Sequence, residues 1–166
     1  MRLLLLLFLF LTLGVASCAQ QSIPEVLKQL NDGTVDYISV ENLHEMEAPL
    51  LLDTREKEEF EVSHLKSSIW VGYTEFDLNK VLQELSNKEK PIVVYCSIGV
   101  RSEDIGEQLK NAGYTNVLNL YGGIFEWKNK GYPVYDENEH KTEKVHPYSR
   151  YWGRFLTNAE KVYGKQ

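Results

Sequence analysis

Short apolar runs that alternate with helix-like segments are the feature that most limits the folds open to this chain. Leu50 to Asp53 and Ile92 to Tyr95 are too short for helices, and "SIWV" and "NVLNLYGG" have the same strand-like character. Helical patterns separate them in "REKEEFEVSHL", at Glu75 to Leu85 and at Glu103 to Asn111. Because parallel strands need long crossover connections and are buried on both faces, this alternation predicts an α/β fold. We expect a central, mainly parallel sheet with helices on both faces.

The ends of this unit carry weaker signals. Ser22 and Glu25 have the spacing of a capping box, which predicts a short helix before the first strand-like patch at Tyr37 to Val40. A short helix is also expected at Phe125 to Lys128. The length of 166 residues and the hydrophobic content of 43% suit one globular domain. We divide the chain into residues 1–17, a signal peptide; 18–36, a linker and short helix; 37–134, the main domain; and 135–166, a C-terminal extension.

The first residues have the order of a secretory signal peptide. Arg2 precedes an apolar run from Leu3 to Leu13, and small residues follow in "GVASC". The run is too short to cross a bilayer as a helix of the mature protein. The sequence therefore predicts export to the cell envelope, on the periplasmic side.

Two cleavage patterns overlap at Cys18. "VASC" resembles the bacterial lipobox, in which the cysteine is lipidated and becomes the first residue of the mature chain. The small residues around Cys18 also suit ordinary signal peptidase, which would leave the cysteine in a discarded peptide. The lipobox is the favoured alternative, and acyl chains on Cys18 would then anchor the protein to a membrane. The formal net charge of −6 gives no basic surface for nucleic acid or for anionic lipid.

Cysteine usage singles out Cys96. The chain has two cysteines, and lipidation or removal of Cys18 leaves Cys96 as the one free thiol of the mature protein. Exported proteins usually use cysteines in pairs, so a leftover thiol is a candidate reactive group. A buried packing role is the alternative, because free cysteine is among the most buried residue types.

The stretch "YCSIGVRS" places Cys96 between a strand and a helix. Loop amides and a helix N-terminus both favour a thiolate there, with Arg101 as the nearest cation in sequence. Gly99 permits a positive φ or a close backbone approach, and Ser102 is placed to cap the following helix. A loop after a strand of a parallel sheet lies where such sheets bind ligands.

Three blocks in order resemble the rhodanese family, whose members carry sulfur as a cysteine persulfide. The loop has four residues between Cys96 and Arg101, as the family's active-site loop does. The upstream block "LLDTREKEEFEVSHL" and the closing block "NVLNLYGGIFEWKNKGYPV" match its other signatures, and together they cover about Ile38 to Val134. Ser63 departs from the pattern, which usually has glycine there. Phosphatases and arsenate reductases of similar fold have a loop one residue longer, so the spacing favours sulfur chemistry.

The resemblance implies a sulfurtransferase. The Cys96 thiolate would take the outer sulfur of a donor such as thiosulfate and pass it to cyanide or a thiol, with no cofactor. The residues expected to bind substrate form the loop itself: Ser97, Ile98, Gly99, Val100, Arg101 and Ser102. Arg101 would orient an oxyanion, although no basic residue lies between it and Cys96. The other class of function is a binding or redox-sensing module of the cell envelope that uses this fold without turnover.

Residues outside the loop are expected to support it. Asp53 and Arg55 are predicted to form a polar brace under the site, with a substrate contact by Arg55 as the alternative. His64 is expected to be a structural hydrogen-bonding residue rather than a general base. Of the closing block's residues, Gly122 and Gly123 are expected to shape the backbone and Trp127 to pack in the core.

The remaining sequence signals concern metals and the tail. The other histidines, His44, His140 and His146, lack metal-ligand spacing, so no metal site is predicted. The segment "VHPYSRYWGRFLTNAEKVYG" combines five aromatic residues with two arginines. It predicts a short terminal helix with a buried aromatic face. The alternative is a partner-binding or substrate-gating surface.

Overall fold

The centre of the fold is a parallel sheet. The computed structural model describes residues 21–85 and 87–164, so Cys18 and the predicted signal peptide lie outside the described residues. Five strands pair in the order β1-β5-β4-β2-β3, and all four pairings are parallel. Their bounds are β1 Tyr37–Ile38, β2 Leu50–Asp53, β3 Ile69–Trp70, β4 Ile92–Tyr95 and β5 Val117–Leu120. The predicted α/β class and parallel sheet are confirmed.

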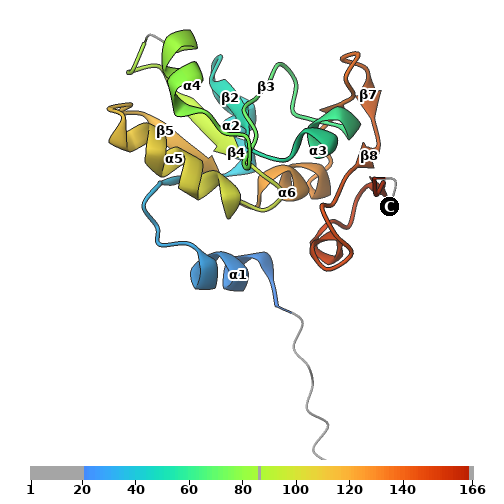
Figure 1. Cartoon of the computed structure of the whole chain (residues 1–166). Coiled ribbons are helices and arrows are strands. Elements are labelled where there is room, and N and C mark those ends of the chain that lie inside the picture. The colour runs from blue at the N-terminus through green and yellow to red at the C-terminus, as the bar shows by residue number, and fades with distance from the viewer. Residues whose placement is uncertain (1–20, 86, 165–166) are drawn as a thin grey trace, which may run out of the picture.

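Helices cover both faces of this sheet, as predicted (Figure 1). The helices are α1 Ile23–Leu30, α2 Val40–Glu45, α3 Lys57–Val62, α4 Leu78–Glu84, α5 Arg101–Asn111 and α6 Gly123–Asn129. Side chains alternate along β4, so Ile92 and Val94 pack with α4 and α5 while Val93 and Tyr95 pack with α1, α2 and α6. None of the helices in the described ranges is long and apolar enough to cross a membrane.

Helix starts differ from the predicted ones for local reasons. α4 begins at Leu78, three residues later than predicted, because the side chain of Asp77 accepts hydrogen bonds from the N–H groups of Asn79 and Lys80. α5 begins at Arg101, two residues earlier than predicted, and α6 begins at Gly123. α1 has the predicted capping box, since the N–H and hydroxyl of Ser22 donate to the Glu25 carboxylate.

The C-terminal segment is not the single terminal helix that we predicted. It contains strands β6 Val134–Tyr135, β7 Lys141–Thr142, β8 Lys144–Val145 and β9 Glu160–Lys161, with a 3₁₀ turn at Trp152–Phe155. β6 pairs antiparallel with β7, and β8 pairs parallel with β9. Val145, Phe155 and Leu156 are buried in the same cluster as α6, whereas Tyr148 and Tyr151 remain exposed. The segment, orange to red in Figure 1, lies beside α3 and α6.

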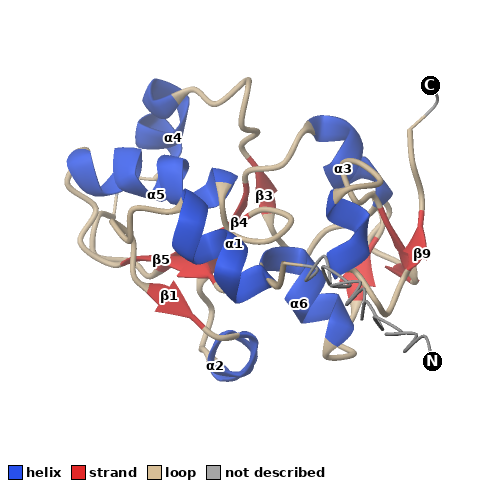
Figure 2. Cartoon of the chain, turned by 90° about the horizontal axis from the view of Figure 1, so that it is seen from below, coloured by secondary structure: helices blue, strands red, loops and turns tan. Residues whose placement is uncertain are grey.

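The start of α6 is joined directly to the loop after β4. The carbonyl oxygen of Cys96 accepts from the N–H of Ile124 at 3.0 Å, and that of Ser97 accepts from Phe125 at 3.1 Å. A Cβ on Gly123 would lie 2.3 Å from the Cys96 oxygen, and the φ of Gly123 is +54°. Only glycine allows this approach, which agrees with the backbone role expected of the pair Gly122 and Gly123. Figure 2 shows α6 and the other helices from a second side.

Replacement of Gly123 by alanine should destabilise the fold through this contact. Gly131→Ala is the matched control, because Gly131 also has a positive φ, +85°, but nothing lies within 4 Å of its Cβ position. Gly131→Ala is expected to cost roughly 1–2 kcal/mol of unfolding free energy. Gly123→Ala should cost roughly 1–3 kcal/mol more, because the added methyl overlaps backbone atoms. Urea denaturation of both variants measures the difference, and equal costs would contradict the assigned contact.

Candidate active site

Cys96 lies at the carboxyl end of β4, one of the inner strands of the sheet. Its side chain is 2% exposed, and its Sγ accepts a hydrogen bond from the N–H of Gly99 at 3.2 Å. Gly99 has a φ of +107°, as its predicted role requires. The N–H groups of Ser97, Ile98 and Val100 donate to no acceptor in the described ranges. The loop therefore gives the sulfur one N–H donor and leaves three neighbouring N–H groups available to a negative charge.

Arg101 is held by Glu59, an acidic residue of the upstream family block. Its Nη1 donates to Glu59 Oε2 at 2.7 Å, and its Nη2 donates to Glu59 Oε1 at 2.9 Å. Ser97 completes the triangle, because its Oγ donates to Glu59 Oε1 and accepts from Arg101 Nη2, both at 3.0 Å. A bidentate pair of this kind fixes the guanidinium in one plane. The structure pairs the charge of Arg101 with Glu59 and does not show it facing an anion. That Arg101 orients an oxyanion of the substrate therefore stays a prediction.

The charges of this pair hold each other ionised. Burial alone would raise the pKa of Glu59, but the hydrogen bonds and charge of Arg101, with the charge of Arg55, bring it below its usual value. Burial alone would lower the pKa of Arg101, and the Glu59 contacts and the nearby Cys96 raise it overall. Glu59 is 1% exposed, so an unpaired carboxylate there would be costly.

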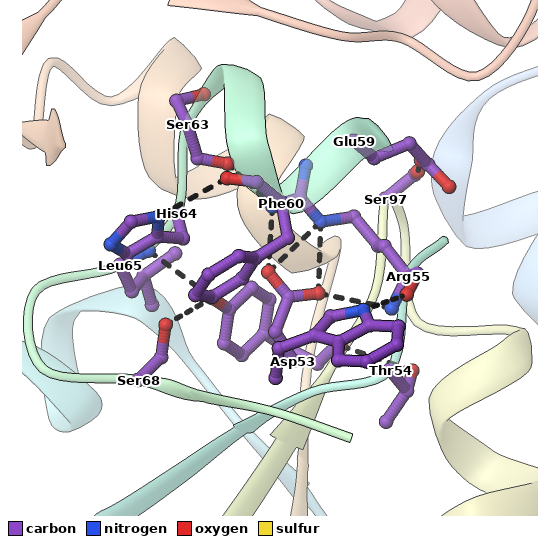
Figure 3. Close-up of polar contacts among 12 residues, drawn as sticks. Asp53, Thr54, Arg55, Glu59, Phe60, Ser63, His64, Leu65, Ser68 and Ser97 are labelled. Carbon is purple, nitrogen blue, oxygen red and sulfur yellow. Dashed lines mark hydrogen bonds and ion pairs between the residues drawn. The ribbon is translucent and has the colours of Figure 1, made fainter. Parts of the chain in front are cut away.

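Asp53 and Arg55 form a fully buried brace below the loop, as predicted. Arg55 Nη2 donates to Asp53 Oδ2 at 2.6 Å and to the Ser63 carbonyl at 2.6 Å, and both side chains are 0% exposed. Trp70 Nε1 donates to the Arg55 carbonyl at 2.9 Å. Figure 3 shows the pair between β2 and α3. Because Arg55 is enclosed by protein groups, it does not line the cavity described below.

The Ser63 and His64 positions are structural. Ser63 has a φ of −170°, an extended conformation that any residue adopts, so serine fits where the family pattern has glycine. His64 is 3% exposed, and its Nδ1 lies 3.1 Å from the Phe60 carbonyl while its ring stacks on Phe60 at 4.1 Å. Backbone hydrogen bonds to Tyr135 tie it to β6. This is the hydrogen-bonding role expected of His64.

Ser102 does not cap α5, contrary to our prediction. The helix begins at Arg101, so Ser102 lies inside its first turn. The Ser102 hydroxyl is buried and donates to Asn119 Oδ1 at 2.8 Å. Asn119 Nδ2 donates in turn to the Gly99 carbonyl at 2.8 Å, and Asn31 Nδ2 donates to the same oxygen at 2.9 Å. Ser102 thus supports the loop from behind. No sequence signal marked Asn31 or Asn119, because their partner is a backbone carbonyl distant in sequence.

A cavity of about 310 Å³ opens above the sulfur. Its lining residues are Glu56, Tyr73, Thr74, Cys96, Ser97, Ile98, Val100, Arg101, Tyr148 and Trp152. Cys96 and four of the six loop residues predicted to bind substrate therefore line it, while Gly99 and Ser102 do not. Tyr148 and Trp152 come from the C-terminal segment, which agrees with the alternative of a substrate-gating surface. The aromatic residues of the tail were the sequence signal that could have pointed to Tyr148 and Trp152 as cavity residues. No such signal marked Glu56, Tyr73 or Thr74.

Tyr148 is positioned by His146. The Tyr148 N–H lies 3.1 Å from His146 Nδ1, and the Gly164 N–H lies 3.0 Å from His146 Nε2. His146 is 8% exposed, and burial lowers its pKa below the ordinary value. The charges of Arg55 and Arg101 lower it further against opposing effects of Glu58 and Glu59. A neutral imidazole accepts at one ring nitrogen only, so His146 can accept one of these two bonds at a time, and a protonated imidazole can accept neither.

Metal ligands are not gathered in the described part of the chain. Within it, no group of three or more His, Cys, Asp or Glu side chains lies close enough to hold a metal ion. Of the histidines without metal-ligand spacing in the sequence, His44 packs against Trp127 and Tyr132. Trp127 is buried, as expected, and its Nε1 donates to the Pro133 carbonyl at 2.9 Å.

Comparison with known proteins agrees with this geometry. The family described as "Rhodanese-like domain" matches residues 25–130, which is more than half of the chain. The chain belongs to the rhodanese-like family. Within this family its domain is homologous to proteins named as sulfurtransferases. The matched range begins inside α1 and ends just after α6, so the cavity residues Tyr148 and Trp152 lie outside it.

The named relatives match this rhodanese-like domain at moderate identity. A thiosulfate sulfurtransferase of Coxiella burnetii is 28% identical over 90 residues, which cover 54% of this chain and 80% of that protein. An adenylyltransferase and sulfurtransferase of Ogataea parapolymorpha is 33% identical over 101 residues, 59% of this chain but only 25% of that protein. The crystal structure of a rhodanese-related protein from Thermoplasma volcanium aligns with a TM-score of 0.53 at 32% identity, covering 60% of this chain and 96% of that one.

The lowered pKa of His146 predicts an acid-sensitive fold. The unfolded chain binds a proton at this residue more readily than the folded chain does. The stabilising contribution is therefore fully present above about pH 6.5 and is lost as the pH falls toward the lower folded pKa. The melting temperature should fall below about pH 6.5 in the native protein, and His146→Gln should flatten that part of the profile. His140→Gln, at an exposed histidine, is the control; identical profiles for the three proteins would contradict the assignment.

Proposed function

We propose that this protein is a sulfurtransferase that carries a sulfane sulfur as a persulfide on Cys96. The observation that carries the proposal is a single thiol at a strand end, with a loop N–H on its sulfur and further unpaired loop N–H groups beside it. Family membership and homology to sulfurtransferases support the same chemistry. The cavity is large enough for a small donor and opens on that sulfur.

Transfer takes place in two displacements. The Cys96 thiolate attacks the outer sulfur of the donor, a new S–S bond forms at Sγ, and the donor's own bond to that sulfur breaks. The leaving group departs with the electron pair; for thiosulfate it is sulfite. A thiolate or cyanide then attacks the outer sulfur of the persulfide, and Cys96 departs as a thiolate. A covalent intermediate of this kind predicts ping-pong kinetics.

The loop amides are the groups that would stabilise the intermediate. A persulfide extends one sulfur beyond Sγ and carries its negative charge on that outer atom. The N–H groups of Ser97, Ile98 and Val100 belong to residues that line the cavity, so they are available to a charge at its base. Preorganised donors of this kind need no rearrangement during the reaction.

A binding or redox-sensing module is the second candidate. It is supported by Cys96, the one thiol of the described residues, which is nearly buried, and by the aromatic tail residues that line the same cavity. In that case Cys96 would be oxidised or conjugated without passing sulfur on.

Export and lipid anchoring through Cys18 belong to this proposal as well. They rest on the signal-like residues 1–17 and on "VASC" in the sequence. An acylated protein would partition into the detergent phase after extraction, and Cys18→Ala would move to the aqueous phase. A Cys18→Ala protein that still partitions with detergent would contradict the anchor.

Persulfide mapping tests the sulfur-transfer proposal directly. After treatment with a panel of sulfane donors, the Cys96 peptide should gain the mass of one sulfur atom, and cyanide should remove it as thiocyanate. Cys96→Ser should show neither the adduct nor thiocyanate while keeping the native circular dichroism spectrum. An adduct that cyanide and thiols cannot discharge would favour the sensing module. A folded protein whose reduced Cys96 accepts sulfur from no donor would exclude the transferase.

A further inference from the structure

The cavity above Cys96 has no unpaired cation. Arg101 is the only Lys, Arg or His among its lining residues, and both of its terminal nitrogens donate to Glu59. Figure 3 shows the Glu59 carboxylate beside Ser97, next to this loop. Glu56 is the carboxylate that lines the cavity, and its Oε1 accepts from the Thr74 hydroxyl at 2.8 Å. A donor that enters this cavity therefore meets the Glu56 carboxylate and one cation, which is already paired with the buried Glu59.

Aromatic side chains form the outer part of the cavity. Tyr73 follows β3, whereas Tyr148 and Trp152 belong to the C-terminal segment, and all three line the cavity. The Tyr148 ring centroid lies 4.8 Å from the Arg101 guanidinium carbon, so the ring covers part of the one cationic group. Tyr73 donates to Asp104 at 2.7 Å, which adds another carboxylate near the entrance.

Tyr148 is held at this position by a strained backbone. Its φ is +63°, a conformation that non-glycine residues adopt rarely and at a cost. Its N–H lies 3.1 Å from His146 Nδ1, which accepts a hydrogen bond from it when the imidazole proton is on Nε2. Strained residues of this kind concentrate at functional sites, and here the strain directs a half-exposed aromatic ring over the cavity.

We propose that the sulfur donor is an organic persulfide with an apolar or aromatic body and at most one negative charge, rather than the thiosulfate dianion. This inference rests on the proposed transfer through Cys96. A dianion would give up the hydration of two charges without gaining a free cation. An aromatic or apolar body would instead bury its surface against the rings of Tyr148 and Trp152.

The transfer from such a donor balances without a further reactant. The Cys96 thiolate attacks the terminal sulfur of R–S–SH, the Sγ–S bond forms, and the S–S bond of the donor breaks. The thiolate R–S⁻ departs with the electron pair and takes the proton of the terminal sulfur. The products are the Cys96 persulfide anion and the thiol R–SH.

The experiment compares the rates at which two donors load Cys96 in the full chain. Benzyl persulfide, released from a caged precursor, and thiosulfate are supplied at equal concentration, and the Cys96 adduct is followed by mass. The native protein should be loaded about tenfold faster by benzyl persulfide. Loading by thiosulfate at an equal or greater rate would overturn the inference and leave the proposed function standing. Loading by neither donor, nor by any other in the panel, would overturn the proposed function itself.

Two pairs of variants assign the preference to the cavity wall. Tyr148→Ala should slow loading by benzyl persulfide about two- to tenfold, the size expected of one aromatic contact, and leave thiosulfate loading unchanged or faster. Tyr151→Ala is the control, because Tyr151 is 53% exposed against 52% for Tyr148 but does not line the cavity. Glu56→Gln should raise thiosulfate loading several-fold, and Glu61→Gln, an exposed change on α3 outside the cavity, should not. Equal effects within each pair would overturn the assignment.

Discussion

The hydrogen bonds from the first N–H groups of α6 to the carbonyls of Cys96 and Ser97 are the contact on which the site depends. They fix the loop by its backbone, so the loop's conformation does not rely on the reacting side chain. Gly123 makes the approach possible, since any side chain there would overlap the Cys96 carbonyl. Two asparagines hold the Gly99 carbonyl on the opposite side of the loop. The sulfur is thus presented by a loop in which the carbonyls of Cys96, Ser97 and Gly99 are hydrogen-bonded, while the N–H groups of Ser97, Ile98 and Val100 remain available.

Two buried ion pairs below and beside this loop have different consequences. Asp53 and Arg55 pair with each other away from solvent at the joint between β2 and α3, and neither side chain lines the cavity. Arg101 lines the cavity, and its pairing with the buried Glu59 neutralises the one positive charge that an anionic donor could use. The electrostatic character of the site is therefore decided by Glu59 as much as by Arg101.

The sequence predicted the inner strands well because their side chains are almost uniformly apolar and bounded by turn residues. Leu50–Asp53 and Ile92–Tyr95 agree residue by residue. It predicted helix starts less well, because these depend on which side chain accepts the first free N–H groups. α4 begins at Leu78 because Asp77 caps it. Ser102 was predicted to cap α5, but its hydroxyl donates instead to Asn119, a buried partner in β5. It failed for the tail, where an aromatic-rich pattern forms a 3₁₀ turn between two strands.

By itself the sequence determined the α/β class, the position of Cys96 at the end of a strand and the family blocks around it. These follow from local apolar patterning and from fixed spacing along the chain, which a linear reading can detect. The tertiary structure alone decided what surrounds the sulfur. Glu56, Tyr73, Tyr148 and Trp152 reach one cavity from segments far apart in sequence, and Glu59 neutralises Arg101 from 42 residues away. Charge and shape at a site depend on such distant neighbours, because side chains interact through space and not along the chain.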